Sequence, residues 1–186
     1  STQKLFAANK LLQDSFIHCL QTGDLVLRTG ADATSAMFVQ VSTKEKKYSH
    51  CGIVIVENGY PFVYHSIGGE DNPDEKMRRD SANYWCSPNY NLGMAVGQWQ
   101  LNDTQKQRLL HIIKEWYSHK LVFDMDFDLA TDDKLYCAEM VYKAITFATK
   151  DSLYIQPTSF LKYHFVAIDN LYMNEHVKLI CLLKYK

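Results

Sequence analysis

The fold is decided by the stretch YSHCGIVIVENGYPFVYHS, residues 48–66. Its first half is an apolar run rich in β-branched residues, and such runs form buried strands. Asn58-Gly59 follows, the pair most typical of a two-residue hairpin turn, and a second strand then continues to His65. The stretch therefore predicts a β-hairpin with His50 and His65 side by side at its open end, where one imidazole can orient the other.

The other elements are placed outward from this hairpin. Apolar residues at helical spacing predict an amphipathic helix over 4–21, and Asn102 with Gln105 has the capping-box pattern of a helix that runs to about residue 119. A further helix is predicted from Cys137 to Ala148. The remaining predictions are strands at 25–28, 94–101 and 176–185, a short helix at 32–42 and a mobile polar loop at 68–80. Together they predict one α+β domain over residues 1–186, with a mainly antiparallel sheet flanked by helices.

Composition excludes several classes of function. The net charge is −1, so no basic field favours nucleic acid or an acidic membrane surface. No apolar run reaches the roughly 18–20 residues of a stable membrane span. The sequence begins at Ser1, which is consistent with a removed export signal or a trimmed tag; an exported, periplasmic or cell-envelope protein is favoured.

The five cysteines are few and widely spread, with no CxxC pair and no zinc-finger spacing. A disulfide framework is not expected, although the count leaves room for one bridge, and at least one thiol should stay free. His111 and His119 are eight residues apart, which is not the spacing of a helical ligand pair. No metal and no cofactor are expected.

Cys137 is the candidate nucleophile. It lies at the predicted start of a helix, where unpaired backbone N–H groups and the helix dipole lower the pKa of a thiol. The same N–H groups can stabilise an oxyanion. Cys51 alternates to the opposite face of its strand from His50 and is expected to pack in the core.

Four segments carry a resemblance to a known superfamily: GDLVLR (23–28), YSHCGIVI (48–55), FVYHS (62–66) and YCAEMVYKA (136–144). They resemble the NlpC-type papain-like hydrolases, but with the Cys helix last rather than first. This rotated order is similar to the permuted papain-like amidases of the YaeF/YiiX type and, more distantly, to the lecithin:retinol acyltransferase group. The resemblance covers about residues 22–150. It implies a circularly permuted papain-like fold, in which a mainly antiparallel sheet or barrel packs against the nucleophile-bearing helix.

The resemblance also implies roles for individual residues. Cys137 would be the nucleophile, His50 the general base and His65 the third, orienting residue. The third position is often Glu in the YaeF/YiiX type, so His65 would supply no fixed negative charge. Glu57 is the alternative candidate for this role. It ranks below His65 because its predicted position in the hairpin turn is far from His50. The family also tends to have Ser or Thr where this sequence has Ala138.

Three more residues are candidates for the substrate site. Tyr48 and Tyr136 flank the predicted site in sequence, and core packing is an equally good explanation for both. Asp124 lies in the acidic approach to Cys137 and could shape the site. The expected substrate is a small molecule, a peptide or a lipid conjugate.

The sequence leaves three functions open. The first is a cysteine-dependent hydrolase of amide bonds, in cell-wall peptides or in amino-acid or lipid conjugates, that works through a thioester. The second is a thiol acyltransferase with lipid or amine acceptors, which would use the same Cys–His pair. The third is a non-catalytic binding domain.

Overall fold

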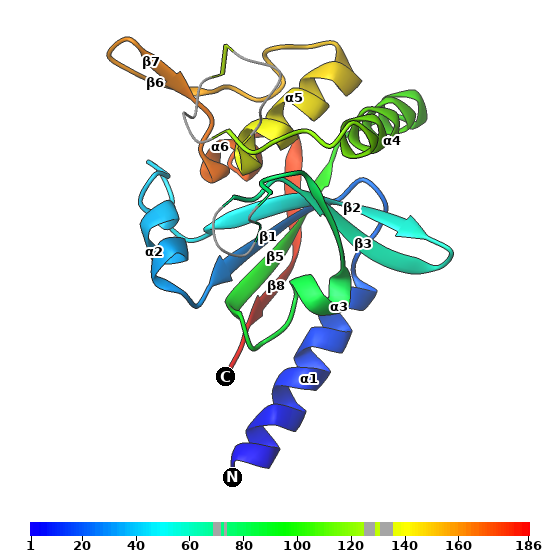
Figure 1. Ribbon diagram of the computed structural model, residues 1–186, viewed down its shortest axis with the longest axis vertical. Coiled ribbons are helices and arrows are strands. Elements are labelled where there is room, and N and C mark those ends of the chain that lie inside the picture. Colours follow the sequence, from blue (N-terminus) through cyan, green and yellow to red (C-terminus); the bar gives the residue numbers. More distant parts are fainter. Residues whose placement is uncertain (69–71, 73, 125–128, 131–135) are drawn as a thin grey trace.

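A six-stranded sheet between two layers of helices forms the centre of the computed structural model, which describes residues 1–68, 72, 74–124, 129–130 and 136–186 (Figure 1). The strand order is β4-β3-β2-β1-β5-β8, and every neighbouring pair is antiparallel. The strands are β1 (Leu25–Gly30), β2 (His50–Glu57), β3 (Tyr60–His65), β4 (Arg78–Ser81), β5 (Asn91–Trp99) and β8 (Val177–Lys184). In the described part of the chain this sheet is open, with β4 and β8 at its edges, so the predicted α+β class and antiparallel sheet are confirmed and a closed barrel is not formed.

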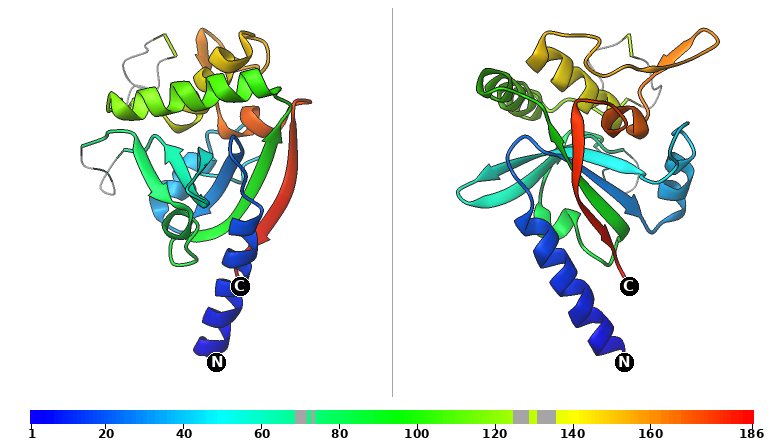
Figure 2. Two further views of the ribbon diagram at one scale, coloured as in Figure 1. Left: turned by 90° about the vertical axis from the view of Figure 1, so that its right-hand side faces the viewer. Right: turned by 180° about the vertical axis from the view of Figure 1, so that it is seen from behind.

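Helices cover both faces of the sheet. The helices are α1 (Thr2–His18), α2 (Ala33–Val39), α3 (Ala82–Trp85), α4 (Asp103–Ser118), α5 (Cys137–Thr149) and α6 (Ile168–Tyr172). Helices α4, α5 and α6 lie on one face, while α1 and α3 lie on the other (Figures 1 and 2). A separate hairpin of β6 (Thr158–Phe160) and β7 (Tyr163–Phe165) projects beside α5. None of the described helices is long and apolar enough to cross a bilayer.

Two hydrophobic cores arise from the alternation of side chains along the central strands. On β2, Ile53 and Ile55 point toward α5, whereas Val54 between them points toward α3. All three are almost completely buried, which explains why β2 is apolar on both faces. The predicted hairpin is confirmed: Glu57 pairs with Tyr60 across the Asn58-Gly59 turn.

The helix predictions succeed where capping signals exist. The capping box that begins α4 is present, with the backbone N–H of Gln105 donating to the Asn102 side chain at 2.8 Å and the reverse bond at 2.9 Å. The helix predicted over 4–21 is present as α1 (Thr2–His18), although much of it lies outside the core. Only its last turns pack on the sheet, through Phe16, and the first turns project from the body with Phe6 64% exposed (Figure 2).

The loop predicted over 68–80 requires a correction. Its last three residues belong to β4, which pairs with β3, while residues 69–71 and 73 lie outside the described part. Strand β4 consists of Arg-Arg-Asp-Ser, so it has no apolar alternation by which a sequence pattern could detect it.

One disulfide is present, between Cys19 at the end of α1 and Cys181 in β8. This bridge agrees with the sequence prediction, which allowed for one disulfide among the five cysteines. Cys51, Cys86 and Cys137 are free.

Candidate functional site

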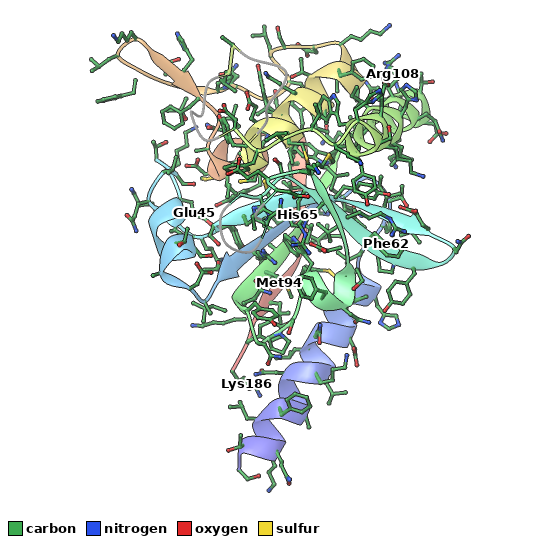
Figure 3. The ribbon with its side chains drawn as sticks, in the orientation of Figure 1. Glu45, Phe62, His65, Met94, Arg108 and Lys186 are labelled. Atoms are coloured by element: carbon green, nitrogen blue, oxygen red, sulfur yellow. A yellow bond between two sulfur atoms is a disulfide. The ribbon has the colours of Figure 1, made fainter. Side chains whose placement is uncertain are left out.

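The hairpin brings His50 and His65 together, as predicted. His50 begins β2 and His65 ends β3, and their Nε2 and Nδ1 atoms lie 2.7 Å apart. Both rings also lie beside Trp85, with centroid distances of 6.0 and 6.2 Å, so they share the α3 face of the sheet. Figure 3 shows His65 near the centre of the molecule, with α4 and α5 on one side and α1 on the other.

Asp80 extends this pair to a chain of three residues. His65 Nε2 lies 2.7 Å from Asp80 Oδ2, and the guanidinium of Arg78 donates to Asp80 Oδ1 at 2.8 Å. The sequence prediction missed Asp80 because it was assigned to the loop over 68–80 rather than to a strand beside His65. His65 has no negative charge of its own, but Asp80, its hydrogen-bond partner, supplies one.

The hydrogen bonds determine which ring nitrogens carry protons when both imidazoles are neutral. A carboxylate only accepts, so Nε2–H of His65 donates to Asp80 and Nδ1 of His65 is left to accept. Nε2–H of His50 must then donate to that Nδ1. This assignment leaves the lone pair of His50 on Nδ1, which is the nitrogen of a general base.

The surroundings keep both histidines neutral. Burial lowers the pKa of His50 well below its ordinary 6.5, and the positive charge of Arg28 lowers it further. Burial also lowers the pKa of His65, although the hydrogen bond to Asp80 opposes this shift. Burial tends to raise the pKa of Asp80, but the hydrogen bonds from His65 and Arg78 outweigh it and the pKa falls.

Cys137 begins α5, as predicted, and its thiol is set apart from the other two free ones. Cys51 and Cys86 are buried, whereas Cys137 is partly exposed. A hydrogen bond from the Cys51 thiol lowers the pKa of Cys137, burial opposes it, and backbone N–H groups at the helix start lower it further. Burial and the same contact raise the pKa of Cys51 well above its usual range, so Cys51 is the proton donor of the pair.

The two halves of the candidate site lie on opposite faces of the sheet at the first residues of β2. Cys51 packs in the core beneath α5, as the alternation predicted, and it also contacts Cys137, which the sequence did not predict. Cys51 follows His50 in the chain but points to the other face of the sheet, so the Cys137 sulfur lies on the α5 face and the His50 ring on the α3 face. Among the hydrogen bonds of the described residues, none joins this sulfur to the His50 ring.

The three predicted substrate-site residues are all buried. Tyr136 directly precedes α5, and its hydroxyl accepts the backbone N–H of Val166 at 2.8 Å. Asp124 is 1% exposed, and its charge acts on Tyr136 and on Glu139 of α5, so it lies by the start of that helix. Tyr48 packs edge-on against Tyr172 at 5.5 Å. These contacts place Tyr136 and Asp124 beside the helix that Cys137 begins.

Glu57 lies at the other end of the hairpin from His50. It accepts hydrogen bonds from the Tyr64 hydroxyl at 2.5 Å and from the Arg79 guanidinium at 3.1 Å. Glu57 is therefore too far from His50 to orient its ring, whereas His65 is in contact with it.

A curated protein and a solved structure are similar to this chain. No protein-family model matches the chain. A 125-residue segment is 24% identical to the uncharacterized protein YiiX of Escherichia coli strain K12; it covers 66% of this chain but only 56% of that protein. The crystal structure of the metalloprotein YiiX from Escherichia coli O157:H7, of the DUF1105 family, matches with a TM-score of 0.69 and 18% identity, covering 87% of this chain and 96% of the other. The chain is therefore a low-identity homologue of YiiX and has the same fold.

Proposed function

We propose that this protein is a cysteine-dependent hydrolase of amide bonds with a permuted papain-like fold. The observation that carries the proposal is the state of Cys137: a partly exposed thiol with a lowered pKa at the start of a helix. The neutral His50, held by His65 and Asp80, supports it as the accompanying base.

The proposed reaction begins when the Cys137 thiol gives its proton to His50 Nδ1; because the two groups lie on opposite faces of the sheet, this step requires one of them to move toward the other. The thiolate attacks the carbonyl carbon of an amide, and backbone N–H groups at the start of α5 stabilise the oxyanion. The C–N bond then breaks, and the amine leaves with the proton from His50. Water attacks the thioester, again giving a proton to His50, and the carboxylic acid is released while Cys137 regains its proton.

The chain from His50 to Asp80 would support each proton transfer. When His50 gains a proton on Nδ1 it becomes positively charged, and its Nε2–H bond to His65 strengthens. Asp80 supplies the negative charge behind His65. The positive charge of Arg28 acts in the opposite direction: it lowers the proton affinity of His50 and keeps the resting imidazole neutral.

A metal-dependent reaction is not part of this proposal. The YiiX crystal structure is described as that of a metalloprotein. In the described part of this chain, no group of three or more His, Cys, Asp and Glu side chains could hold a metal ion. Both ring nitrogens of His65 are engaged in hydrogen bonds, so the described donors do not fit a metal centre.

Thiol labelling tests the nucleophile directly. At neutral pH, iodoacetamide should modify Cys137 faster than the other free thiols, and Cys137→Ala should remove this fast reaction in intact-mass measurements. Cys51→Ser keeps a hydrogen-bond donor beside the sulfur and should retain the fast reaction, whereas Cys51→Val should slow it. Equal reaction rates for all three free cysteines of the wild-type protein would contradict the proposal.

The two alternatives give different outcomes in related experiments. An acyl group that persists on Cys137 after exposure to lipid esters, but not after exposure to peptides, would favour an acyltransferase. If the Cys137 thiol reacts at an ordinary rate and Cys137→Ala binds ligands as the wild type does, the protein would instead be a binding domain.

A further inference from the structure

A second thiol lies against the candidate nucleophile. Cys51 of β2 is completely buried beneath α5, and Cys137, the first residue of α5, packs against the same core. The Cys51 thiol donates a hydrogen bond to the Cys137 sulfur, so the two sulfur atoms are in direct contact. The proposed hydrolysis consumes only one of these thiols. The pair as a whole therefore has a capacity that the hydrolysis does not use.

The two thiols differ in what can reach them from solution. Cys137 is partly exposed, whereas Cys51 has no exposed surface. An oxidant in solution can therefore meet the Cys137 sulfur but not the Cys51 sulfur. The lowered pKa of Cys137 favours the thiolate, which is the form that peroxides oxidise. An accessible thiol of low pKa beside a second thiol is the usual arrangement of a redox-active cysteine pair.

The other cysteines cannot take the place of Cys51. Cys86 is buried in the other core, on the α3 side of the sheet, so the sheet separates it from Cys137. Burial also raises the pKa of Cys86 to about 12, which keeps this thiol protonated and unreactive. Cys19 and Cys181 are already joined to each other. An oxidised Cys137 thus has one thiol partner within the same molecule.

We infer that Cys51 and Cys137 form a second disulfide when a hydroperoxide oxidises the protein. In the first step the Cys137 thiolate attacks the O–O bond, which leaves a sulfenic acid on Cys137 and releases the remainder of the peroxide as water or an alcohol. In the second step the Cys51 sulfur attacks the Cys137 sulfur, the S–S bond forms and the S–O bond breaks. The hydroxide leaves as water with the proton of Cys51, so two thiols are oxidised and one peroxide is reduced.

This inference goes beyond the proposed hydrolysis, because the pair would be oxidised whether or not the protein cleaves amides. If Cys137 is the nucleophile of a hydrolase, the disulfide removes it from the reaction until a thiol reductant restores it. The bond requires the sulfur atoms to approach to about 2.05 Å. Cys137 is at the very start of α5, where the backbone N–H groups are not yet held by bonds within the helix, so this residue can shift with little disruption.

Counting thiols in the denatured protein tests the inference on the wild type, without any substitution. Before oxidation the folded protein has three free thiols. After a small excess of hydrogen peroxide we expect only Cys86 to remain free, with a mass loss of about 2 Da for the two hydrogen atoms removed. Peptide mapping without reductant should show the Cys51 and Cys137 peptides joined. Dithiothreitol should then restore both thiols.

Two variants separate the steps of the oxidation. Cys51→Ser lacks the second thiol, so a sulfenic acid should accumulate on Cys137, where dimedone traps it; circular dichroism checks that this variant is folded. Cys86→Ser is the matched control and should form the disulfide at the wild-type rate.

Three outcomes in the wild type would overturn the inference: no oxidation, pairing of Cys137 with Cys86, or a sulfenic or sulfinic acid on Cys137 while Cys51 stays reduced. The proposed function fails through a different measurement, the rates of iodoacetamide labelling. Fast labelling of Cys137 without a disulfide would contradict this inference alone, so the two failures can be told apart.

Discussion

The substitution Glu139→Gln should make the stability of this protein less dependent on pH. Glu139 is completely buried in the first turn of α5, where its carboxylate accepts the Tyr136 backbone N–H at 3.2 Å and pairs with Lys143 at 3.2 Å. Burial raises its pKa to about 7, although Lys143 and the Tyr136 N–H oppose the shift; the nearby charge of Asp124 adds to it. The ordinary value, 4.5, applies in the unfolded chain.

The magnitude follows from these two values. A pKa difference of about 2.5 units corresponds to about 3 kcal/mol at 1.36 kcal/mol per unit. The folded protein holds the proton more tightly, so this stability is fully present below pH 4.5 and is lost as the pH rises through 7. Gln keeps the capping bond and never ionises, and the effect of Lys143 on the carboxylate is already contained in the pKa of about 7. At pH 8 the variant should therefore be more stable than the wild type by about 3 kcal/mol.

Urea unfolding followed by tryptophan fluorescence between pH 4.5 and 8 measures the free energy of unfolding of both proteins. The difference between them should grow with pH. Asp24, whose pKa is raised to about 6 by burial, titrates in the same direction in both proteins and cancels in the comparison. Glu115→Gln, at an exposed site on α4, is the control and should change little. A difference that is constant across this pH range would refute the reasoning.

Three further predictions concern other parts of the molecule. Replacing Cys19 and Cys181 by Ser should lower the free energy of unfolding by about 2–5 kcal/mol in urea titrations, because the bridge closes a loop of 162 residues. Gly52→Ala should lower it by about 1–3 kcal/mol, since the new methyl group would lie 2.8 Å from a backbone oxygen of β3; circular dichroism melts would detect this. Asp80→Asn should lower the pKa of His65 by about one unit or more in NMR titrations, because the protonated ring loses its negative partner.

The sequence predicts best where backbone preference and side-chain pattern agree. The Asn58-Gly59 turn and the apolar strand before it determine the register that makes His50 and His65 neighbours. The Asn102 capping box and the helix that Cys137 begins are equally local, and both are present. Such features depend on a few adjacent residues, so a single sequence contains them.

The missed features all depend on contacts between distant segments. Strand β4 is polar throughout and is held by its pairing with β3, so Asp80 could not be recognised as a partner of His65. The contact between Cys51 and Cys137 joins residues 86 positions apart, and it depends on how α5 crosses the sheet. The first turns of α1 have the apolar spacing of a packed helix, but they extend beyond the sheet, so their apolar side chains stay exposed.

Helix α1 is bound to the last residue of the described chain. Asn9 in α1 accepts the backbone N–H of Lys186 at 3.0 Å and donates to its carbonyl oxygen at 3.2 Å, and the bridge between α1 and β8 lies nearby in sequence. Figure 1 shows both termini at the same end of the molecule. Helix α1 and strand β8 are thus held together by a covalent bond and by hydrogen bonds at two separate points. Opening of the sheet at its β8 edge would therefore have to displace α1 as well, so this edge is better protected than an edge strand that only backbone pairing holds.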